Sequence, residues 1–315
     1  MKVAILESLA VSQEELQRRK APFEEKGVEF VEFERTTDKD KLIEEAKDAD
    51  AIIIANMPMP GEVISALDQL KFIDVAFTGV DHVGLEAART NNIAVSNASG
   101  YSNEAVSELV FGMTISLARN IRQTEDRCRE GKTKDGLVGW EIKGKTVGIV
   151  GYGKIGSRTA ELFHAFQADI LIYDPIELKN KPDYIEQTSL DDLLGRADIV
   201  VLHCPLIDAT RGMINAEKIA LMKKTAVLIN VARGPVVVAQ DLADALNNGV
   251  IAGAGIDVFD GEPPLDLNEP LLHCKNALVT PHIAFASEQS MSLRAEIVFD
   301  NLTAWMDGNQ KNIIL

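Results

Sequence analysis

Short apolar runs alternate with amphipathic segments along the first hundred residues of the chain. The predicted strands cover residues 3–6, 28–33, 51–55, 72–77 and 93–96. The helical patterns between them cover residues 13–26, 39–48, 61–68 and 82–91. Because alternating strands and helices form parallel sheets covered by helices, this part of the chain predicts a doubly wound α/β domain.

A long helical pattern over residues 104–129 separates this series from a second one, with Ser102 or Asn103 available as its N-cap. The second series of strands and helices begins near residue 145 and continues to about residue 279, and a last helical pattern covers residues 286–305. We therefore predict two doubly wound domains, the second inserted into the first. The predicted boundaries are residues 1–100 with 285–315, and residues 101–284.

The apolar run at residues 147–150 leads directly into three glycines with the spacing G-x-G-x-x-G. Gly151 permits a tight turn, Gly153 lets bare backbone approach a pyrophosphate, and Gly156 lets the following helix pack close to its strand. The predicted phosphate-binding loop also contains Tyr152, Lys154 and Ile155. This motif predicts that the inserted domain is a Rossmann domain that binds a dinucleotide.

An acidic residue, Asp174, follows the next predicted strand, residues 169–173. At this position a carboxylate accepts hydrogen bonds from a ribose 2′-hydroxyl but repels a 2′-phosphate. No arginine follows it at residues 175–177, so we predict NAD as the cofactor, and not NADP. A second glycine pair, Gly253 and Gly255, lies inside an apolar strand and predicts close packing instead.

Composition and charge exclude several classes of protein. Apolar residues make up 46% of the 315 residues and charged residues 25%, as in ordinary globular proteins. The net charge of −16 disfavours a nucleic-acid-binding surface, and no apolar run approaches the ~20 residues of a membrane helix. The three cysteines are scattered, without the spacing of a disulfide framework or a metal site. We expect a cytoplasmic protein with no nucleic-acid, membrane or metal partner.

Three chemically complementary side chains, Arg233, Glu262 and His282, follow three successive predicted strands of the second domain. Ligands bind outside the carboxyl ends of the strands in such sheets. A guanidinium suits bidentate capture of a carboxylate, and an imidazole can supply or take the proton that accompanies hydride movement. A carboxylate on the other ring nitrogen would fix the tautomer. Together they predict the reversible reduction of a 2-oxo acid to a 2-hydroxy acid.

The combined motifs resemble those of the D-isomer-specific 2-hydroxyacid dehydrogenases. The matching segments are the glycine loop and residues 230–234, 257–263 and 280–284. The resemblance implies that the first domain is a flavodoxin-like substrate domain and that the domain inserted into it is a Rossmann domain. It also implies that His282 is the general acid/base, Glu262 its partner and Arg233 the substrate-binding arginine.

Further contacts follow from the resemblance alone. The amides of a first-domain loop would hold the substrate carboxylate, and this loop contains Thr78, Gly79 and Val80. The expected cofactor contacts are His203, Cys204, Pro205, Val231, Ala232, Asp257 and His282. Among them, the resemblance implies that Asp257 lies near the nicotinamide carboxamide. Members of the family are usually homodimers joined through their nucleotide domains, so we expect a homodimer.

The loop expected at the far end of the substrate, residues 56–60, contains no basic residue. A phosphorylated substrate would favour Arg or Lys there. We therefore expect a small unphosphorylated substrate such as hydroxypyruvate or glyoxylate, with Asn56 and Met57 as contacts. Because the chain ends soon after Trp305, we expect a glycerate/hydroxypyruvate-reductase-like short form without a regulatory domain.

Several alternatives stay open at this point. The enzyme could be similar to D-lactate dehydrogenase or phosphoglycerate dehydrogenase. A formate-dehydrogenase-like enzyme needs no acid/base pair, so Glu262 argues against it. A protein of the same fold could also sense NAD(H) without catalysing a reaction, because such proteins can retain all three candidate catalytic residues.

Overall fold

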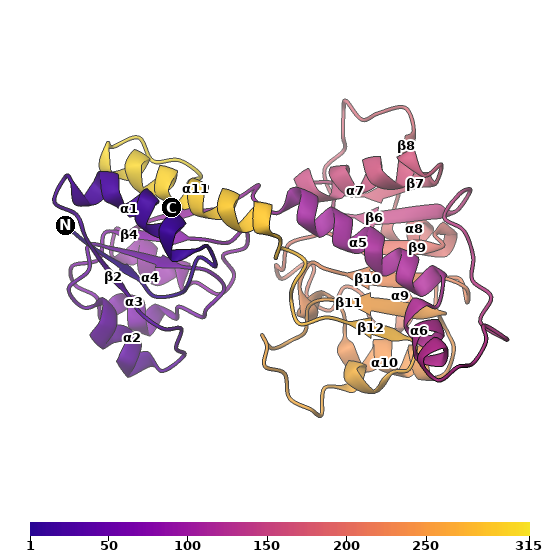
Figure 1. Ribbon diagram of the computed structural model, residues 1–315. Helices are drawn as coiled ribbons and strands as arrows, with labels where there is room; N and C mark the ends of the chain where they lie inside the picture. The colour runs from indigo at the N-terminus through magenta and orange to yellow at the C-terminus, as the bar shows by residue number, and fades with distance from the viewer. The chain divides into compact units, whose positions relative to one another are not determined.

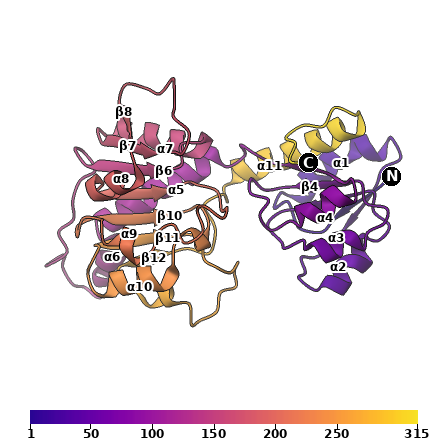
Figure 2. The same cartoon turned by 180° about the vertical axis from the view of Figure 1, so that it is seen from behind.

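The computed structural model describes residues 1–315 as two compact units, each with its own core. Unit 1 consists of Met1–Ser102 and Ala286–Leu315, and unit 2 of Asn103–Phe285. Figures 1 and 2 show a sheet covered by helices in each unit. All strand pairs in both sheets are parallel, so the predicted fold class is confirmed.

Unit 1 contains a five-stranded sheet with the order β2-β1-β3-β4-β5, which is the flavodoxin-like order. Its strands are β1 (Lys2–Ile5), β2 (Glu29–Glu32), β3 (Ala51–Ile54), β4 (Phe72–Val75) and β5 (Ala94–Asn97). Its helices are α1 (Gln13–Glu24), α2 (Lys39–Ala46), α3 (Gly61–Ser65), α4 (Leu85–Thr90) and α11 (Glu288–Met306). Every residue of β3 and β4 is buried, as expected for strands covered on both faces.

The C-terminal helix α11 is part of the core of unit 1. Ser287 begins it with a capping box, and Trp305 near its end stacks on Phe72 of β4 at 4.8 Å between ring centroids. The side-chain amide of Asn301 donates to Asp74 Oδ1 at 3.0 Å, deep in this core. The last helix of the chain therefore packs against β4 of the unit 1 sheet (Figure 1).

Unit 2 contains a seven-stranded sheet with the order β12-β11-β10-β9-β6-β7-β8, the Rossmann order extended by one strand. Its strands are β6 (Thr146–Val150), β7 (Asp169–Tyr173), β8 (Ile185–Gln187), β9 (Ile199–Leu202), β10 (Val227–Asn230), β11 (Gly253–Ile256) and β12 (Ala277–Val279). Its helices are α5 (Asn103–Ala118), α6 (Ile121–Arg129), α7 (Lys154–Ala165), α8 (Leu190–Arg196), α9 (Ala216–Ile219) and α10 (Ala239–Asn247), with short 3-10 turns at Gly234–Val236 and Pro270–His273.

Helices cover both faces of this sheet. Apolar side chains of α5 and α7 form one buried cluster with it, and those of α8, α9 and α10 form the other. An added Cβ at Gly255 of β11 would lie 2.8 Å from Ile229 Cδ1 and 3.3 Å from Met113 Sδ. The predicted close packing at this glycine is confirmed.

The prediction of one helix over residues 104–129 is wrong, because α5 ends at Ala118 and α6 begins at Ile121. Asn120 between them has a left-handed backbone with φ of 51°. The Trp140 N–H donates to the Ala118 carbonyl at 2.9 Å, so a segment further along the chain caps α5. The helical pattern of residues 104–129 could not show this break, because the capping residue lies outside that segment.

Candidate active site

The glycine loop joins β6 to α7, and the structure shows what each glycine does. Gly151 has φ of +95°, and an added Cβ there would lie 2.8 Å from the His203 carbonyl carbon. At Gly156 a Cβ would lie 2.1 Å from the Gly151 oxygen. At Gly153 nothing lies within 4 Å, and this residue begins α7 without a side-chain cap. The loop therefore presents open backbone and uncapped helix amides, which suit a pyrophosphate.

Asp174 lies directly after β7 and contacts this loop. Its Oδ2 accepts a hydrogen bond from the Tyr152 N–H at 3.0 Å, and its Oδ1 accepts one from the Ile176 N–H at 3.0 Å. A carboxylate has about four lone-pair positions, so two remain for ribose hydroxyls. The glycine cradle and this acid together fit NAD.

The segment after β9 lies against the glycine loop with its backbone, but the His203 ring is directed elsewhere. His203 Nε2 lies 2.9 Å from Thr159 Oγ1 of α7, and the Thr159 hydroxyl donates to Ser107 Oγ of α5 at 3.2 Å. Burial lowers the pKa of His203 to about 3 and raises the pKa of Cys204 to about 11. Both side chains are thus neutral at physiological pH, and the ring anchors this segment to the two helices.

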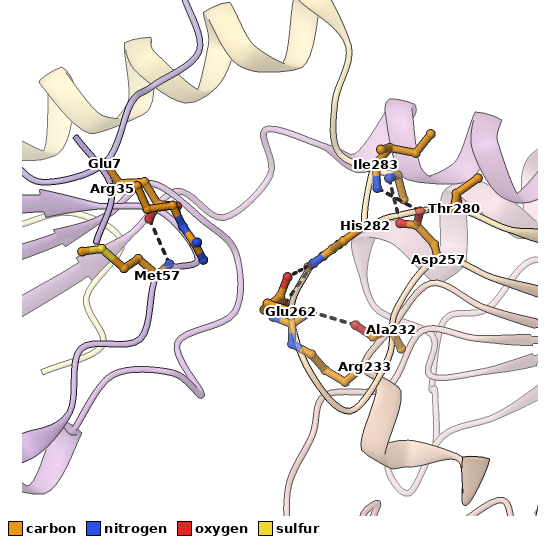
Figure 3. Close-up of polar contacts among 11 residues, drawn as sticks. Glu7, Arg35, Met57, Ala232, Arg233, Asp257, Glu262, Thr280, His282 and Ile283 are labelled. Atoms are coloured by element: carbon orange, nitrogen blue, oxygen red, sulfur yellow. Dashed lines mark hydrogen bonds and ion pairs between the residues drawn. The ribbon is translucent and has the colours of Figure 1, made fainter. Parts of the chain in front are cut away.

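His282 and Glu262 form a hydrogen-bonded pair in unit 2, as Figure 3 shows. His282 Nδ1 lies 2.8 Å from Glu262 Oε2 and 3.0 Å from Oε1. The His282 side chain is only 8% exposed, and its backbone has φ of 55°, which is uncommon for a residue other than glycine. A strained, buried histidine held by a carboxylate is typical of a catalytic acid/base.

Asp257 holds the turn that carries His282 in this backbone. It lies after β11 and is fully buried. Its Oδ1 accepts from the Thr280 hydroxyl at 2.6 Å and the Ile283 N–H at 2.9 Å, while Oδ2 accepts from the Ala284 N–H at 2.8 Å. Burial raises the pKa of Asp257, and these hydrogen bonds act in the opposite direction. The resemblance implied a cofactor contact for this residue, and the geometry gives its carboxylate a positioning role (Figure 3).

Arg233 lies on a tight turn after β10. Asn230 braces this turn, since its Nδ2 donates to the Arg233 carbonyl at 3.0 Å and its Oδ1 accepts from the Ala232 N–H at 3.1 Å. Arg233 Nη1 donates to the Ala232 carbonyl at 2.8 Å. In Figure 3 the Arg233 side chain extends from this turn toward the Glu262–His282 pair. Val231 and Ala232 are buried in the same turn, each 8% exposed.

In unit 1, the loop after β4 presents a row of hydrogen-bond donors. Asn97 Nδ2 donates to the Thr78 carbonyl at 2.7 Å and so fixes this loop. No protein group accepts a hydrogen bond from the backbone N–H of Thr78, Gly79 or Val80. The Thr78 hydroxyl is also buried without a partner. Successive unpaired amides of this kind suit an anion such as a carboxylate.

The loop after β3 contains Asn56 and Met57. Met57 is fully buried, and Asn56 is half-buried. Glu7, which the sequence analysis missed, binds this loop through hydrogen bonds to the backbone N–H groups of Ala55 and Met57. Glu7 directly follows the first predicted strand, so the rule that identified Arg233 could have identified it in the first domain as well.

No helix of the structure combines the length and apolar character needed to cross a lipid bilayer.

Comparison with known proteins identifies the family of the chain. Residues 111–284 match the model of the family described as "D-isomer specific 2-hydroxyacid dehydrogenase, NAD binding domain". The chain is 34% identical over 299 residues to a hydroxypyruvate reductase of Blautia hydrogenotrophica, an alignment that covers 91% of this chain and 92% of that protein. It is 36% identical over 278 residues to a glyoxylate reductase of Korarchaeum cryptofilum, covering 86% and 83%.

A solved structure shows the same likeness in three dimensions. The D-lactate dehydrogenase of Aquifex aeolicus, complexed with NAD and lactic acid, superposes with a TM-score of 0.85 at 30% identity. The superposition covers 98% of this chain and 96% of that chain. Because the family model matches more than half of the sequence and the relatives align over most of it, the chain belongs to the D-isomer-specific 2-hydroxyacid dehydrogenases and is an NAD-dependent oxidoreductase.

Proposed function

We propose that the protein reduces a small unphosphorylated 2-oxo acid, hydroxypyruvate or glyoxylate, to the 2-hydroxy acid, with the D configuration where C2 is a stereocentre, and catalyses the reverse reaction. Relatives named hydroxypyruvate reductase and glyoxylate reductase support this substrate class. The absence of a basic residue from residues 56–60 supports an unphosphorylated substrate.

The cofactor contacts are part of the proposal. The amides at Gly151–Gly156 and the first turn of α7 would hold the pyrophosphate of NAD, and Asp174 would hold the adenosine ribose. The backbone of residues 203–205 and 231–232 would line the same site. When bound, NAD supplies hydride transfer to or from the C2 atom of the substrate.

The protein's own groups bind the substrate and move the proton. In unit 1, the amides of Thr78–Val80 bind the substrate carboxylate. In unit 2, the Arg233 guanidinium binds the carboxylate and polarises the C2 carbonyl. Because His282 Nδ1 is bonded to Glu262, proton exchange with the C2 oxygen takes place at Nε2. During reduction the protonated ring gives this proton to the oxygen, and during oxidation the neutral ring takes it back.

The His282–Glu262 hydrogen bond is the observation that carries the proposal. Removing a hydride from formate involves no hydroxyl proton, so that reaction has no use for an acid/base pair. Oxidation of a hydroxy acid requires a base for the hydroxyl proton, and the Glu262 carboxylate stabilises the protonated ring that results.

The test is loss of nicotinamide absorbance when NADH is mixed with the protein and a panel of 2-oxo acids. We expect turnover with hydroxypyruvate and glyoxylate, slow turnover with 3-phosphohydroxypyruvate, and D-glycerate as the product of hydroxypyruvate in chiral analysis. No turnover across the panel would contradict the proposal and favour an NAD(H)-sensing protein that does not catalyse the reaction.

We also infer that the protein is a cytoplasmic homodimer joined through unit 2. Helix α6 has no buried residue. Close to it in the chain are the half-buried apolar side chains of Ile115, Leu117 and Trp140 and the exposed side chain of Val138, and Ile121 at its own first position is exposed as well. A second copy covering this face would bury them. Light scattering should give twice the chain mass of 34.4 kDa, and cell fractionation tests the location.

A further inference from the structure

The segment that follows α11 returns to the sheet of unit 1 and pairs with β5, the strand at one edge of that sheet (Figure 1). Ile313 forms an antiparallel bridge with Ser96. The Val95 N–H donates to the Leu315 carbonyl at 3.0 Å, and the Ile314 N–H donates to the Val95 carbonyl at 2.8 Å. This segment therefore covers polar backbone groups that an edge strand would otherwise leave exposed.

Asn312 lies in this segment and bonds to the core of unit 1 from the surface. Its backbone is left-handed, with φ of 48°, a conformation that asparagine adopts more readily than most residues. Its carbonyl accepts a hydrogen bond from the Asn97 N–H at 3.1 Å, and its Nδ2 donates to Asn301 Oδ1 at 2.8 Å. One exposed residue is thus bonded both to the end of β5 and to a buried side chain of α11.

The hydrogen bonds of the Asn301 amide, which is fully buried, fix its orientation. Its Nδ2 donates to Asp74 Oδ1 and to the Asn97 carbonyl, both at 3.0 Å, while its Oδ1 accepts from Asn312. Rotating the amide by half a turn would place Oδ1 against the Asn97 carbonyl and Nδ2 against the Asn312 nitrogen, so neither hydrogen bond could form. The donor from Asn312 therefore helps to determine which way the buried amide points.

Asn97 connects this amide to the loop after β4. The residue ends β5 and is 7% exposed. Its Nδ2 donates to the Thr78 carbonyl at 2.7 Å. Because the peptide bond is planar, the direction of the Thr78 carbonyl sets the direction of the Gly79 N–H. A chain of hydrogen-bonded residues thus runs from Asn312 through Asn301 and Asn97 to the loop whose amides suit a carboxylate.

We propose that Asn312 is a positioning residue that, through Asn301 and Asn97, holds the Gly79 N–H in the direction that binds the substrate carboxylate. This inference rests on the proposed function, which assigns that carboxylate to the amides of residues 78–80. Both intermediate side chains are buried, so water does not compete for their hydrogen bonds. Without the Asn312 donor, Asn301 Oδ1 loses its partner in the core and the amide loses its single preferred orientation. Substrate binding then weakens, whereas hydride and proton transfer, which other groups perform, do not change.

The experiment measures carboxylate binding in the full-length protein with two substitutions at Asn312. Asn312→Gly removes the donor and Asn312→Asp replaces it with an acceptor, and both new residue types tolerate a left-handed backbone. We expect the KM for hydroxypyruvate to rise about 5-fold in the first variant, the size of one hydrogen bond's net contribution, and further in the second. The Kd of oxamate, an unreactive analogue of a 2-oxo acid, should rise in parallel in the NADH complex. The values of kcat and of the NADH affinity should not change, which separates positioning from a general loss of structure.

Asn92 supplies the matched control. It is also an exposed asparagine of unit 1 with a left-handed backbone, at φ of 55°, and its side chain makes no hydrogen bond within the protein. Asn92→Gly and Asn92→Asp should leave the KM and the oxamate Kd unchanged.

Wild-type KM and oxamate Kd in both Asn312 variants would overturn the inference, as would an equal rise in the Asn92 variants or a fall in kcat alone. If no 2-oxo acid is turned over but oxamate binds more weakly to the Asn312 variants than to the wild type, the proposed function fails and this inference stands. If the wild type neither turns over a 2-oxo acid nor binds oxamate, both are rejected.

Discussion

At the scale of single residues, the pairing of His282 with Glu262 gives a direct test of the proton-transfer step. Glu262→Gln keeps a hydrogen-bond acceptor near Nδ1 but removes the charge that stabilises the protonated ring. We expect kcat/KM for hydroxypyruvate to fall about 10²-fold, a typical contribution of acid/base catalysis, with NADH affinity unchanged in a fluorescence titration. Asp260→Asn, an exposed acid in the same loop, is the control. Full activity in Glu262→Gln would reject the assigned pair.

Asp74 gives a residue-scale prediction about stability. Its side chain is fully buried in unit 1, Oδ1 accepts from Asn301, and Oδ2 has no partner. Burial raises the pKa of Asp74 well above its usual value, and the Asn301 hydrogen bond acts in the opposite direction. Because the folded state holds the proton more tightly, this group loses stabilising free energy as the pH rises above its unfolded pKa of about 4.

Asp74→Asn removes this dependence on pH. We expect the variant to be more stable than the wild type at neutral pH by at least about 1 kcal/mol, because each pH unit above the unfolded pKa costs the wild type about 1.4 kcal/mol until the folded pKa is reached. The difference should shrink as the pH approaches about 4. Urea denaturation at a series of pH values measures it, with the exposed Asp68→Asn as control. A difference that does not vary with pH would contradict a buried, titrating carboxyl group.

At the scale of elements, the sequence predicted the strands well because the core of each parallel sheet requires continuous apolar runs. The glycine loop was also predictable, since Gly151 and Gly156 satisfy steric needs that exist in any strand–turn–helix of this kind. The local sequence pattern did not show the break after Ala118, because the residue that caps α5 there, Trp140, lies further along the chain.

Contacts between distant segments account for the rest of what the sequence did not reveal. Asp257 accepts hydrogen bonds from the turn that carries His282, and the His203 ring lies against Thr159. Both contacts form only when separate elements of the fold pack together. Arg233, Glu262 and His282 could be nominated because each follows a strand, but their hydrogen bonds could not be derived from spacing. Polar residues that directly follow parallel strands are candidates for the site in either unit. Applying this rule to unit 1 would have identified Glu7.

Gly234 lies where the turn that carries Arg233 packs against the segment that leads to Glu262, so a substitution there tests whether the two segments are coupled. An added Cβ would lie 2.0 Å from both the carbonyl carbon and the oxygen of Phe259, so the Arg233 turn or the segment leading to Glu262 must move. We expect Gly234→Ala to lower kcat/KM about 10²-fold, as small misplacements of catalytic groups do, and to cost about 1–3 kcal/mol in stability. Gly195→Ala in α8, where the nearest atom is 3.9 Å away, should be neutral. Wild-type kinetics in Gly234→Ala would show that the two segments are not coupled.

At the scale of the whole molecule, the charge of the chain constrains how two copies can associate. Each chain carries a net charge of −16, so two copies repel one another at long range. Salt screens this repulsion over about 8–10 Å at ordinary ionic strength. An interface between copies must therefore gain its free energy from buried apolar surface, and the proposed dimer should tighten as salt is added.

Val138 allows this interface to be tested without disturbing the fold. Its side chain is 80% exposed in the single chain, so Val138→Asp should not affect the stability of the monomer. In the proposed dimer the same change buries an unpaired charge, which is costly. We expect the dimer dissociation constant to rise at least about 10-fold in sedimentation-velocity dilution series. Leu267→Asp is the matched control. Leu267 is 81% exposed and also belongs to unit 2, but it is not one of the side chains around α6 that form the proposed interface. If both variants associate as tightly as the wild type, this face is not where the copies meet.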